Sequence, residues 1–348
     1  MDSPCVLEAL LQVSAVASGY PVETVTRRGA GMFHLQAMSN PPGVDSPSSA
    51  LRMIACFVLA RTLLFVDVIP DSWERTFQGT GAFLYFRRFT FADTVERRVW
   101  LSFLTLVTRL EVAYCLMNQL APNWISGLAH QIQEQSEISN TRDNIPQRIL
   151  DTSIRCLRLL IDAMNISFTV PEASDDATAP PGEFDPSHFN QRNELMDRLD
   201  AWQRSRPPDL KPLIEVDHPK GNFPTIIFTS GAGISANIIY HTAMALLLRN
   251  KQDSTSTDEH GEALEMVGPQ ESPDWHAQRV CGIAINSEPE HARCWDPIMI
   301  AAFWLATQGL NLRSQQDQVL VCLSQLKAAG WHIDILINKL HEKWGHAN

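Results

Sequence analysis

Residues 276–306 alternate between apolar and polar stretches in a way that predicts two consecutive helices. In the first helix the apolar residues recur at steps of three and four and therefore share one face: Ala277, Val280, Cys281 and Ala284. A polar break follows at 286–290, and Trp295-Asp296-Pro297 then provides a cap and a proline at the first helical position. The next run, 298–305, is apolar almost all the way round, which predicts a helix buried on most sides.

The same periodicity recurs along the rest of the chain and predicts an all-α, multihelical fold. Further helices are expected over 4–18, 24–38, 50–66, 93–117, 147–164, 186–205, 314–327 and 331–344, and in the apolar run that carries Tyr240 and His241. Only 224–229 has a short β-branched run typical of a strand. Segments rich in Pro, Ser, Gly or acidic residues predict long surface loops at 39–49, 171–185 and 250–273. We expect one domain over residues 1–348.

Composition narrows the class of protein. The chain has 348 residues, of which 45% are hydrophobic, enough for a sizeable core. Its net charge of −11 argues against intrinsic affinity for nucleic acid, because such affinity comes mostly from Lys and Arg placed on phosphates. Two local basic pairs, 87–88 and 97–98, stand beside Asp93 and Glu96, which favours a solvated helix entrance.

The cysteines and the long apolar runs indicate in which kind of cellular compartment the protein works and whether it contacts a membrane. The seven cysteines are spread singly with no Cys-x-x-Cys, which favours a reducing compartment. The amino end has no pattern typical of a secretory signal. Two runs, 51–69 and 99–117, are long enough to suggest a membrane span, but both carry central charges. We therefore expect core helices and no membrane contact.

Several motifs, in their order along the chain, carry a resemblance. They are the Arg-Arg-Val-Trp at 97–100, a leucine helix ending in Trp202 before prolines, Phe223-Pro224-Thr225-Ile226, Tyr240-His241, Arg279-Val280-Cys281-Gly282-Ile283-Ala284, Trp295-Asp296-Pro297, and Gly330-Trp331 with Leu340 and Trp344. Together they resemble the fungal-specific transcription factor domain, the regulatory region that follows a zinc binuclear cluster in such factors.

The resemblance implies a nuclear regulator of transcription, of a metabolic or secondary-metabolite gene set, with a helical core that senses a small effector. It also implies pairing, with a second copy or with another zinc-cluster factor. The six-cysteine cluster itself is missing, so we expect no direct specific DNA binding by this chain. Two explanations stay open: an amino-terminal exon was lost from the gene model, or the protein acts by pairing with an intact factor.

A few motifs suggest other chemistry. The stretch 230–235, Ser-Gly-Ala-Gly-Ile-Ser, resembles the opening of the nicotinamide site of sirtuin deacylases, but the continuation differs and we interpret it as a helix cap. Gly79-x-Gly81 lacks a third glycine. Four residues have the side-chain types of zinc ligands, but their spacing matches no recurrent zinc-binding pattern: His276, Cys281, His291 and Cys294.

His241 lies on an apolar helix face, where we expect a core histidine that donates to a carbonyl; an effector contact is the alternative. No Gly-x-Ser-x-Gly elbow occurs in the sequence. We therefore assign no catalytic, cofactor-binding or metal residue, expect no enzyme, and leave the ligand-binding residues open. The alternative function is a helical small-molecule-binding protein or an enzyme with a buried pocket.

Overall fold

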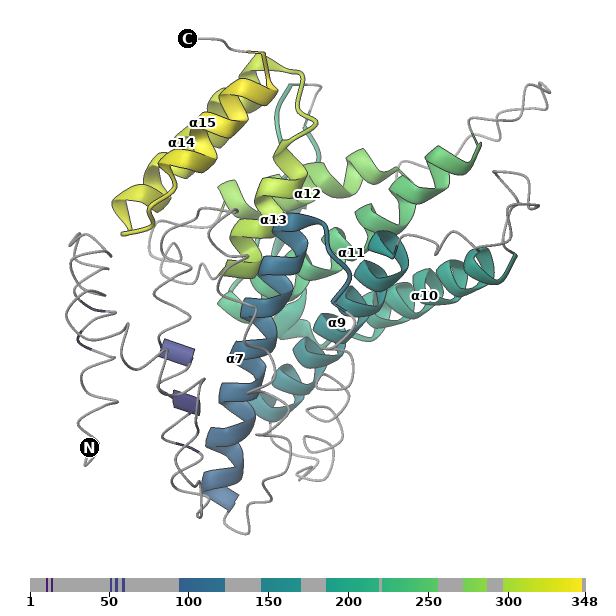
Figure 1. Cartoon of the computed structure of the whole chain (residues 1–348), viewed down its shortest axis with the longest axis vertical. Helices are drawn as coiled ribbons and strands as arrows, with labels where there is room; N and C mark the ends of the chain where they lie inside the picture. Colours follow the sequence, from purple (N-terminus) through teal and green to yellow (C-terminus); the bar gives the residue numbers. More distant parts are fainter. Residues whose placement is uncertain are drawn as a thin grey trace, which may run out of the picture. The chain divides into compact units, whose positions relative to one another are not determined.

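The computed structural model describes residues 94–122, 145–169, 186–218, 221–255, 272–286 and 297–345, together with a few isolated positions before residue 60. These residues form eight α-helices and one two-stranded sheet (Figure 1). The all-α prediction is confirmed. The expected helices 4–18, 24–38 and 50–66 and the loops 39–49 and 171–185 lie wholly or almost wholly outside the described residues.

The helices follow the predicted order with shifted ends. Their bounds are α7 Thr94–Asn118, α9 Ile145–Phe168, α10 Pro186–Ser205, α11 Gly231–Thr255, α12 Pro273–Ile285, α13 Pro297–Thr307, α14 Arg313–Ala328 and α15 Asp334–Lys343. A 3-10 turn, η2, covers Pro208–Leu210. The helix α11 continues through Thr255 and so takes up the start of the loop predicted at 250–273.

The chain divides into two compact units, one made of residues 1–114 with 317–348 and the other of residues 115–316. The prediction of one domain over 1–348 stays a prediction. Each unit is described by itself.

In the unit 115–316, α11 lies between α9 and α10 on one side and α12 and α13 on the other (Figure 1). Every residue from 236 to 248 is buried, because the sequence offers no polar stripe that could face water. The helix begins after Ser230, whose Oγ accepts from the Gly233 amide at 3.1 Å and donates to the Asp209 carbonyl at 3.1 Å.

The short sheet meets α12 at a glycine. Strands β1 (Ile214–Val216) and β2 (Thr225–Ile227) pair antiparallel, with Glu215 opposite Ile226. Just before β2, the Pro224 carbonyl oxygen lies so close to Gly282 that a Cβ at this position would overlap it. The Asn286 Nδ2 donates to the same oxygen at 3.1 Å. A hydrogen in place of a side chain at position 282 is therefore required for this approach.

The predicted buried helix at 298–305 is confirmed as α13, which begins at Pro297 as the Asp-Pro entry predicted. Every residue of α13 is buried. In the other unit, the end of α14 is followed by Gly330 with φ of 101°, a left-handed conformation that ends the helix. The Trp331 amide donates to the Leu326 carbonyl at 3.2 Å, and Leu340 on α15 is buried while Trp331 is half-buried.

Two of the described helices are long and apolar enough to cross a membrane, Val95–Asn118 and Gly231–Arg249. Of the apolar window in the second, 83% is buried inside the protein, which is what a core helix shows. The expectation of no membrane contact stays a prediction.

We predict that Gly282→Ala lowers the free energy of unfolding by about 2 kcal/mol or more, because the new methyl group meets a backbone carbonyl that cannot turn aside. Gly309→Ala is the matched control, since a Cβ at Gly309 meets nothing within 4 Å. Its effect should stay within about 0.5 kcal/mol. Denaturant unfolding of the two variants checks this, and equal stabilities would contradict the close approach at Pro224.

Candidate functional site

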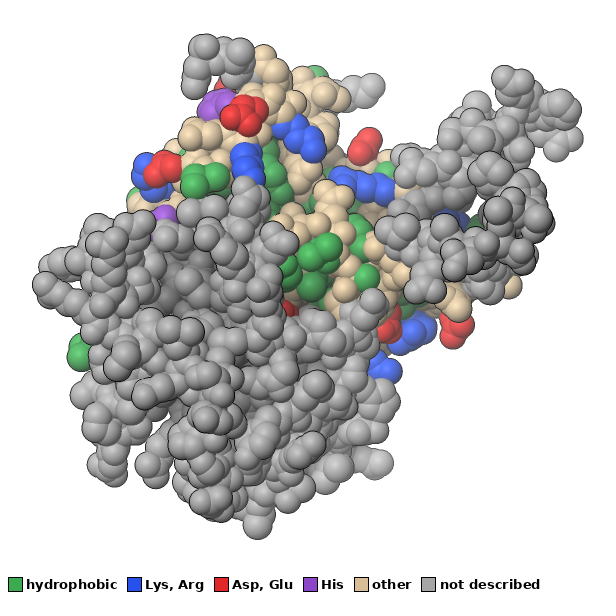
Figure 2. Space-filling model, in the orientation of Figure 1, with side chains coloured by type: hydrophobic (Ala, Val, Ile, Leu, Met, Phe, Trp, Pro, Cys, Tyr) green, Lys and Arg blue, Asp and Glu red, His purple; other side chains and the backbone are tan. Residues whose placement is uncertain are grey.

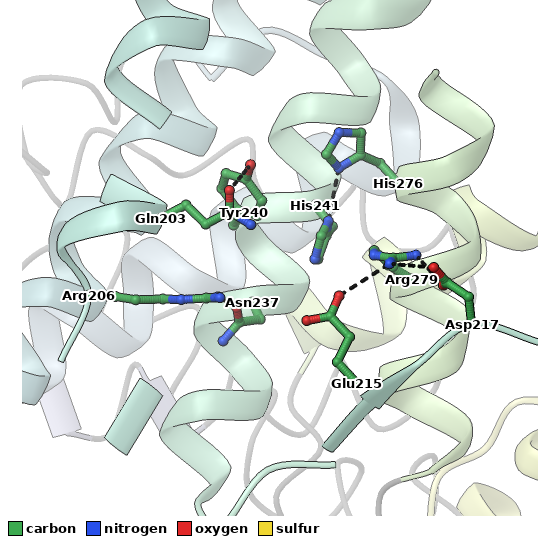
Figure 3. A network of polar contacts seen from close by, with 9 residues as sticks. All are labelled: Gln203, Arg206, Glu215, Asp217, Asn237, Tyr240, His241, His276 and Arg279. Carbon is green, nitrogen blue, oxygen red and sulfur yellow. Dashed lines mark hydrogen bonds and ion pairs between the residues drawn. The ribbon is translucent and has the colours of Figure 1, made fainter. Parts of the chain in front are cut away.

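Polar side chains from α11, the carboxyl end of α10, the β1 segment and α12 gather in one region (Figure 3). We call them the polar cluster; its members are Gln203, Arg206, Glu215, Asp217, Asn237, Tyr240, His241, His276 and Arg279. All belong to the unit 115–316. Buried polar groups need partners, and the contacts below supply them for most of the cluster; the Nε atoms of Arg206 and Arg279 are buried without a hydrogen-bond partner.

A pair of histidines joins α11 to α12. The Nδ1 atoms of His241 and His276 lie 2.9 Å apart, and the two residues are 5% and 1% exposed. The rings of Tyr240 and Trp275 stand edge-on to both imidazoles. A hydrogen bond between two Nδ1 atoms requires one ring to donate and the other to accept, so the pair holds one proton between its facing nitrogens.

The surroundings keep His241 neutral. Burial lowers the pKa of His241 well below its ordinary value of 6.5, and the positive charge that would come from His276, Arg279 and Arg206 lowers that pKa further. The imidazole of His241 is therefore an uncharged hydrogen-bonding group at neutral pH. The predicted core position of this residue agrees with the structure, but its Nδ1 partner is a ring nitrogen and not the expected carbonyl.

Arg279 links α12 to β1. Its guanidinium contacts both carboxylate oxygens of Asp217 at 3.1 and 3.4 Å and Glu215 at 3.2 Å. It also lies over the Trp275 ring, 3.5 Å from the centroid, in a cation–π arrangement. The Arg279 side chain is 6% exposed, whereas those of Glu215 and Asp217 are 42% and 68% exposed. The two carboxylates thus neutralise a buried cation from the solvent side.

Asn237 satisfies several polar groups at once. Its Nδ2 donates to the carbonyls of Leu210 and Gly233, each at 2.7 Å, and its Oδ1 accepts from Nη1 of Arg206. Burial lowers the pKa of Arg206, which remains charged at neutral pH because an arginine titrates so high. This amide holds η2 and the end of α10 against the first turns of α11.

Tyr240 reaches α10. Its hydroxyl contacts Gln203 Oε1 at 2.9 Å and Asp200 Oδ1 at 3.3 Å, and its ring stacks on Trp202 with centroids 5.6 Å apart. Burial, and next the nearby Asp200, raise the pKa of Tyr240, so the phenol stays protonated and acts as a donor. The Trp202 Nε1 donates in turn to the Thr152 carbonyl of α9 at 2.9 Å.

The residues singled out for other chemistry take structural roles where the structure describes them. The stretch 230–235 caps and opens α11, as interpreted, and the space beside Gly233 is filled by the Phe228 ring and the Asp209 carbonyl. Of the four zinc candidates, His276 pairs with His241 and Cys281 is fully buried; His291 and Cys294 lie outside the described residues, as do Gly79 and Gly81.

Within the described ranges, no group of three or more His, Cys, Asp or Glu side chains is placed to hold a metal ion. The expectations of no metal, no cofactor and no catalytic residue stay predictions. What the cluster does offer chemically is a buried proton between two ring nitrogens, with two guanidinium groups nearby.

Sequence reasoning missed the ion pairs of Arg279 and the contacts of Arg206 and Asn237. A signal for Arg279 was present, because it stands in a helix whose neighbours 280–284 are all apolar or small, and a buried charge needs a partner. Comparison with known proteins adds no assignment to these residues: no protein family, curated protein or solved structure matches this chain.

We predict that Arg279→Ala lowers the free energy of unfolding by about 2 kcal/mol, since it removes charge-assisted hydrogen bonds and the stacking on Trp275. Arg198→Ala is the matched control. Arg198 also forms an ion pair, with Asp162 at 3.3 Å, but its side chain is 45% exposed, and the loss should stay below about 1 kcal/mol. Denaturant unfolding measures both; an equal loss in the two variants would contradict the role of Arg279.

Proposed function

We propose that this chain is a helical regulatory domain of a transcription regulator, of the type found in fungal zinc-cluster factors, that works in the nucleus. The proposal rests on the order of sequence motifs. It is supported by one observation above all: three of those motifs, far apart in sequence, meet in one region. Pro224 lies against Gly282, and the imidazole of His241 bonds to that of His276, three residues before Arg279.

The polar cluster suits such a role. A buried ionic and hydrogen-bonded set favours one arrangement of its helices over alternatives, because any other packing leaves charges unpaired. A regulatory domain needs at least one well-defined arrangement that an effector or a partner can stabilise or disfavour. The proposed effector is small, and the proposed partner is a second copy or an intact zinc-cluster factor.

DNA contact is assigned to the partner. The net charge of −11 disfavours approach to phosphates. On the face shown in Figure 2, the basic and acidic side chains of the described residues are intermixed and not gathered by sign. This chain would therefore influence transcription through the factor it binds.

The alternative is a helical small-molecule-binding protein or enzyme. The observation that favours it is the buried His241 with its lowered pKa, since shifted titratable groups gather at functional sites. The two functions differ in what they do to a promoter, and this difference is measurable.

The direct test fuses the full chain to an unrelated DNA-binding domain and measures transcription from a reporter with the matching site in a fungal host. A transcription regulator should change reporter output at least about fivefold relative to the DNA-binding domain alone, which corresponds to about 1 kcal/mol of differential recruitment. The Gly282→Ala fusion should lose the effect while Gly309→Ala keeps it. A soluble, folded fusion that leaves the reporter unchanged would contradict the proposal.

The purified chain should not form a sequence-dependent complex with DNA. A gel-shift series over random and genomic duplexes at physiological salt is expected to show at most the weak, salt-sensitive association of the non-specific class, with Kd of about micromolar or weaker. A duplex bound in the nanomolar range, and not displaced by unrelated DNA, would show that this chain reads DNA itself.

A further inference from the structure

The His241–His276 contact is the place in the polar cluster where two titratable rings face each other directly. His241 comes from the middle of α11 and His276 from the first turns of α12, and the two helices pack side by side. Both imidazoles are buried, so a proton added to either ring places a positive charge inside this helix–helix interface.

Counting protons shows how the contact responds to acid. In the neutral pair, one ring carries its proton on Nδ1 and donates, and the other carries its proton on Nε2 and accepts at Nδ1. A first added proton can go to Nε2 of the donor, which keeps the Nδ1–H···Nδ1 bond and adds one positive charge. A second proton can only go to the accepting Nδ1. Both facing nitrogens then carry hydrogen, and the bond is lost.

We propose that the His241–His276 pair is a pH-sensitive contact that holds α12 against α11 when neutral and releases α12 when acid protonates both facing nitrogens. The release follows because two imidazolium charges, whose facing nitrogens lie 2.9 Å apart in the neutral form, would share a buried interface that already contains Arg279. The inference concerns the interface alone and does not rest on the proposed function.

The charged groups on the surrounding elements favour the neutral pair. Arg279 on α12 and Arg206 after α10 oppose protonation of His241. The acidic groups nearby are already engaged by other side chains: Glu215 and Asp217 of the β1 segment by Arg279, Asp200 of α10 by Tyr240, and Asp274 of α12 through its attraction to Arg249 of α11. The neighbouring α13 and β2 contribute no ionisable side chain, and Cys156 of α9 donates to the Ala236 carbonyl.

The direction of the pH effect follows from the lowered pKa of His241. The folded state binds the proton less readily than the unfolded state. The stabilisation is therefore complete above the ordinary histidine value of about 6.5 and is lost as the pH falls below it. Acid, not base, should loosen the interface.

Hydrogen exchange of the full chain tests this. The protection factors of the α12 amides should fall about tenfold between about pH 7 and pH 5, after correction for the intrinsic pH dependence of exchange. His241→Asn removes the ring whose pKa is lowered and keeps an amide that can still bond to His276, so its α12 amides should change less than about threefold. His218→Asn is the control: His218 is exposed and bonded to Thr225 Oγ1, so this variant should respond like the wild type.

Equal loss of protection in His241→Asn and in the wild type, or no loss in the wild type, would overturn the proposal. The wild type also gives an independent answer through nitrogen NMR of its labelled histidines. One Nδ1–H and one Nε2–H form are expected for the pair near pH 7, and protonated Nδ1 on both rings in acid. Two Nε2–H rings near neutral pH would exclude the shared proton.

Discussion

Burial of α11 on all sides is the constraint on which the unit 115–316 depends. With α9, α10, α12 and α13 around it, the buried part of this helix has no face left for water, so each polar side chain there must find a partner inside the protein. Asn237 does so with two carbonyls and a guanidinium, Thr242 with the Ile238 carbonyl, and His241 with a second histidine. The contacts of Asn237, Tyr240 and His241 in the polar cluster are the consequence of placing polar groups on a helix that is buried all round.

The contacts of the polar cluster also fix the positions of the neighbouring helices and of strand β1. Arg279 would be a costly cation in the interior, but Glu215 of β1 and Asp217, which directly follows the strand, reach it and thereby fix the strand to α12. Gly282 allows the carbonyl before β2 to approach the same helix. Tyr240 and Trp202 tie α10 and α9 to the opposite side of α11. Backbone, charge and aromatic contacts therefore meet in one region.

Sequence periodicity predicted the elements well because it reports which face of a helix is buried. Ala277, Val280, Cys281 and Ala284 share a face and are all buried, and the buried helix 298–305 was also predicted. Periodicity does not tell which distant residue meets that face. The pairs His241–His276 and Arg279–Asp217 join residues 35 and 62 positions apart. Their geometry depends on how helices cross, and for this reason the bonding partner expected for His241 was the wrong kind of atom.

The central claim, that α11 is the element around which the unit 115–316 is built, is tested most directly by native-state hydrogen exchange in rising denaturant. The amides of residues 236–248 should exchange only through global unfolding, with the free energy and denaturant dependence of the whole unit. They should be more protected than the amides of α10 and α12. Exchange of these amides through a local opening, at a free energy well below that of global unfolding, would contradict the account.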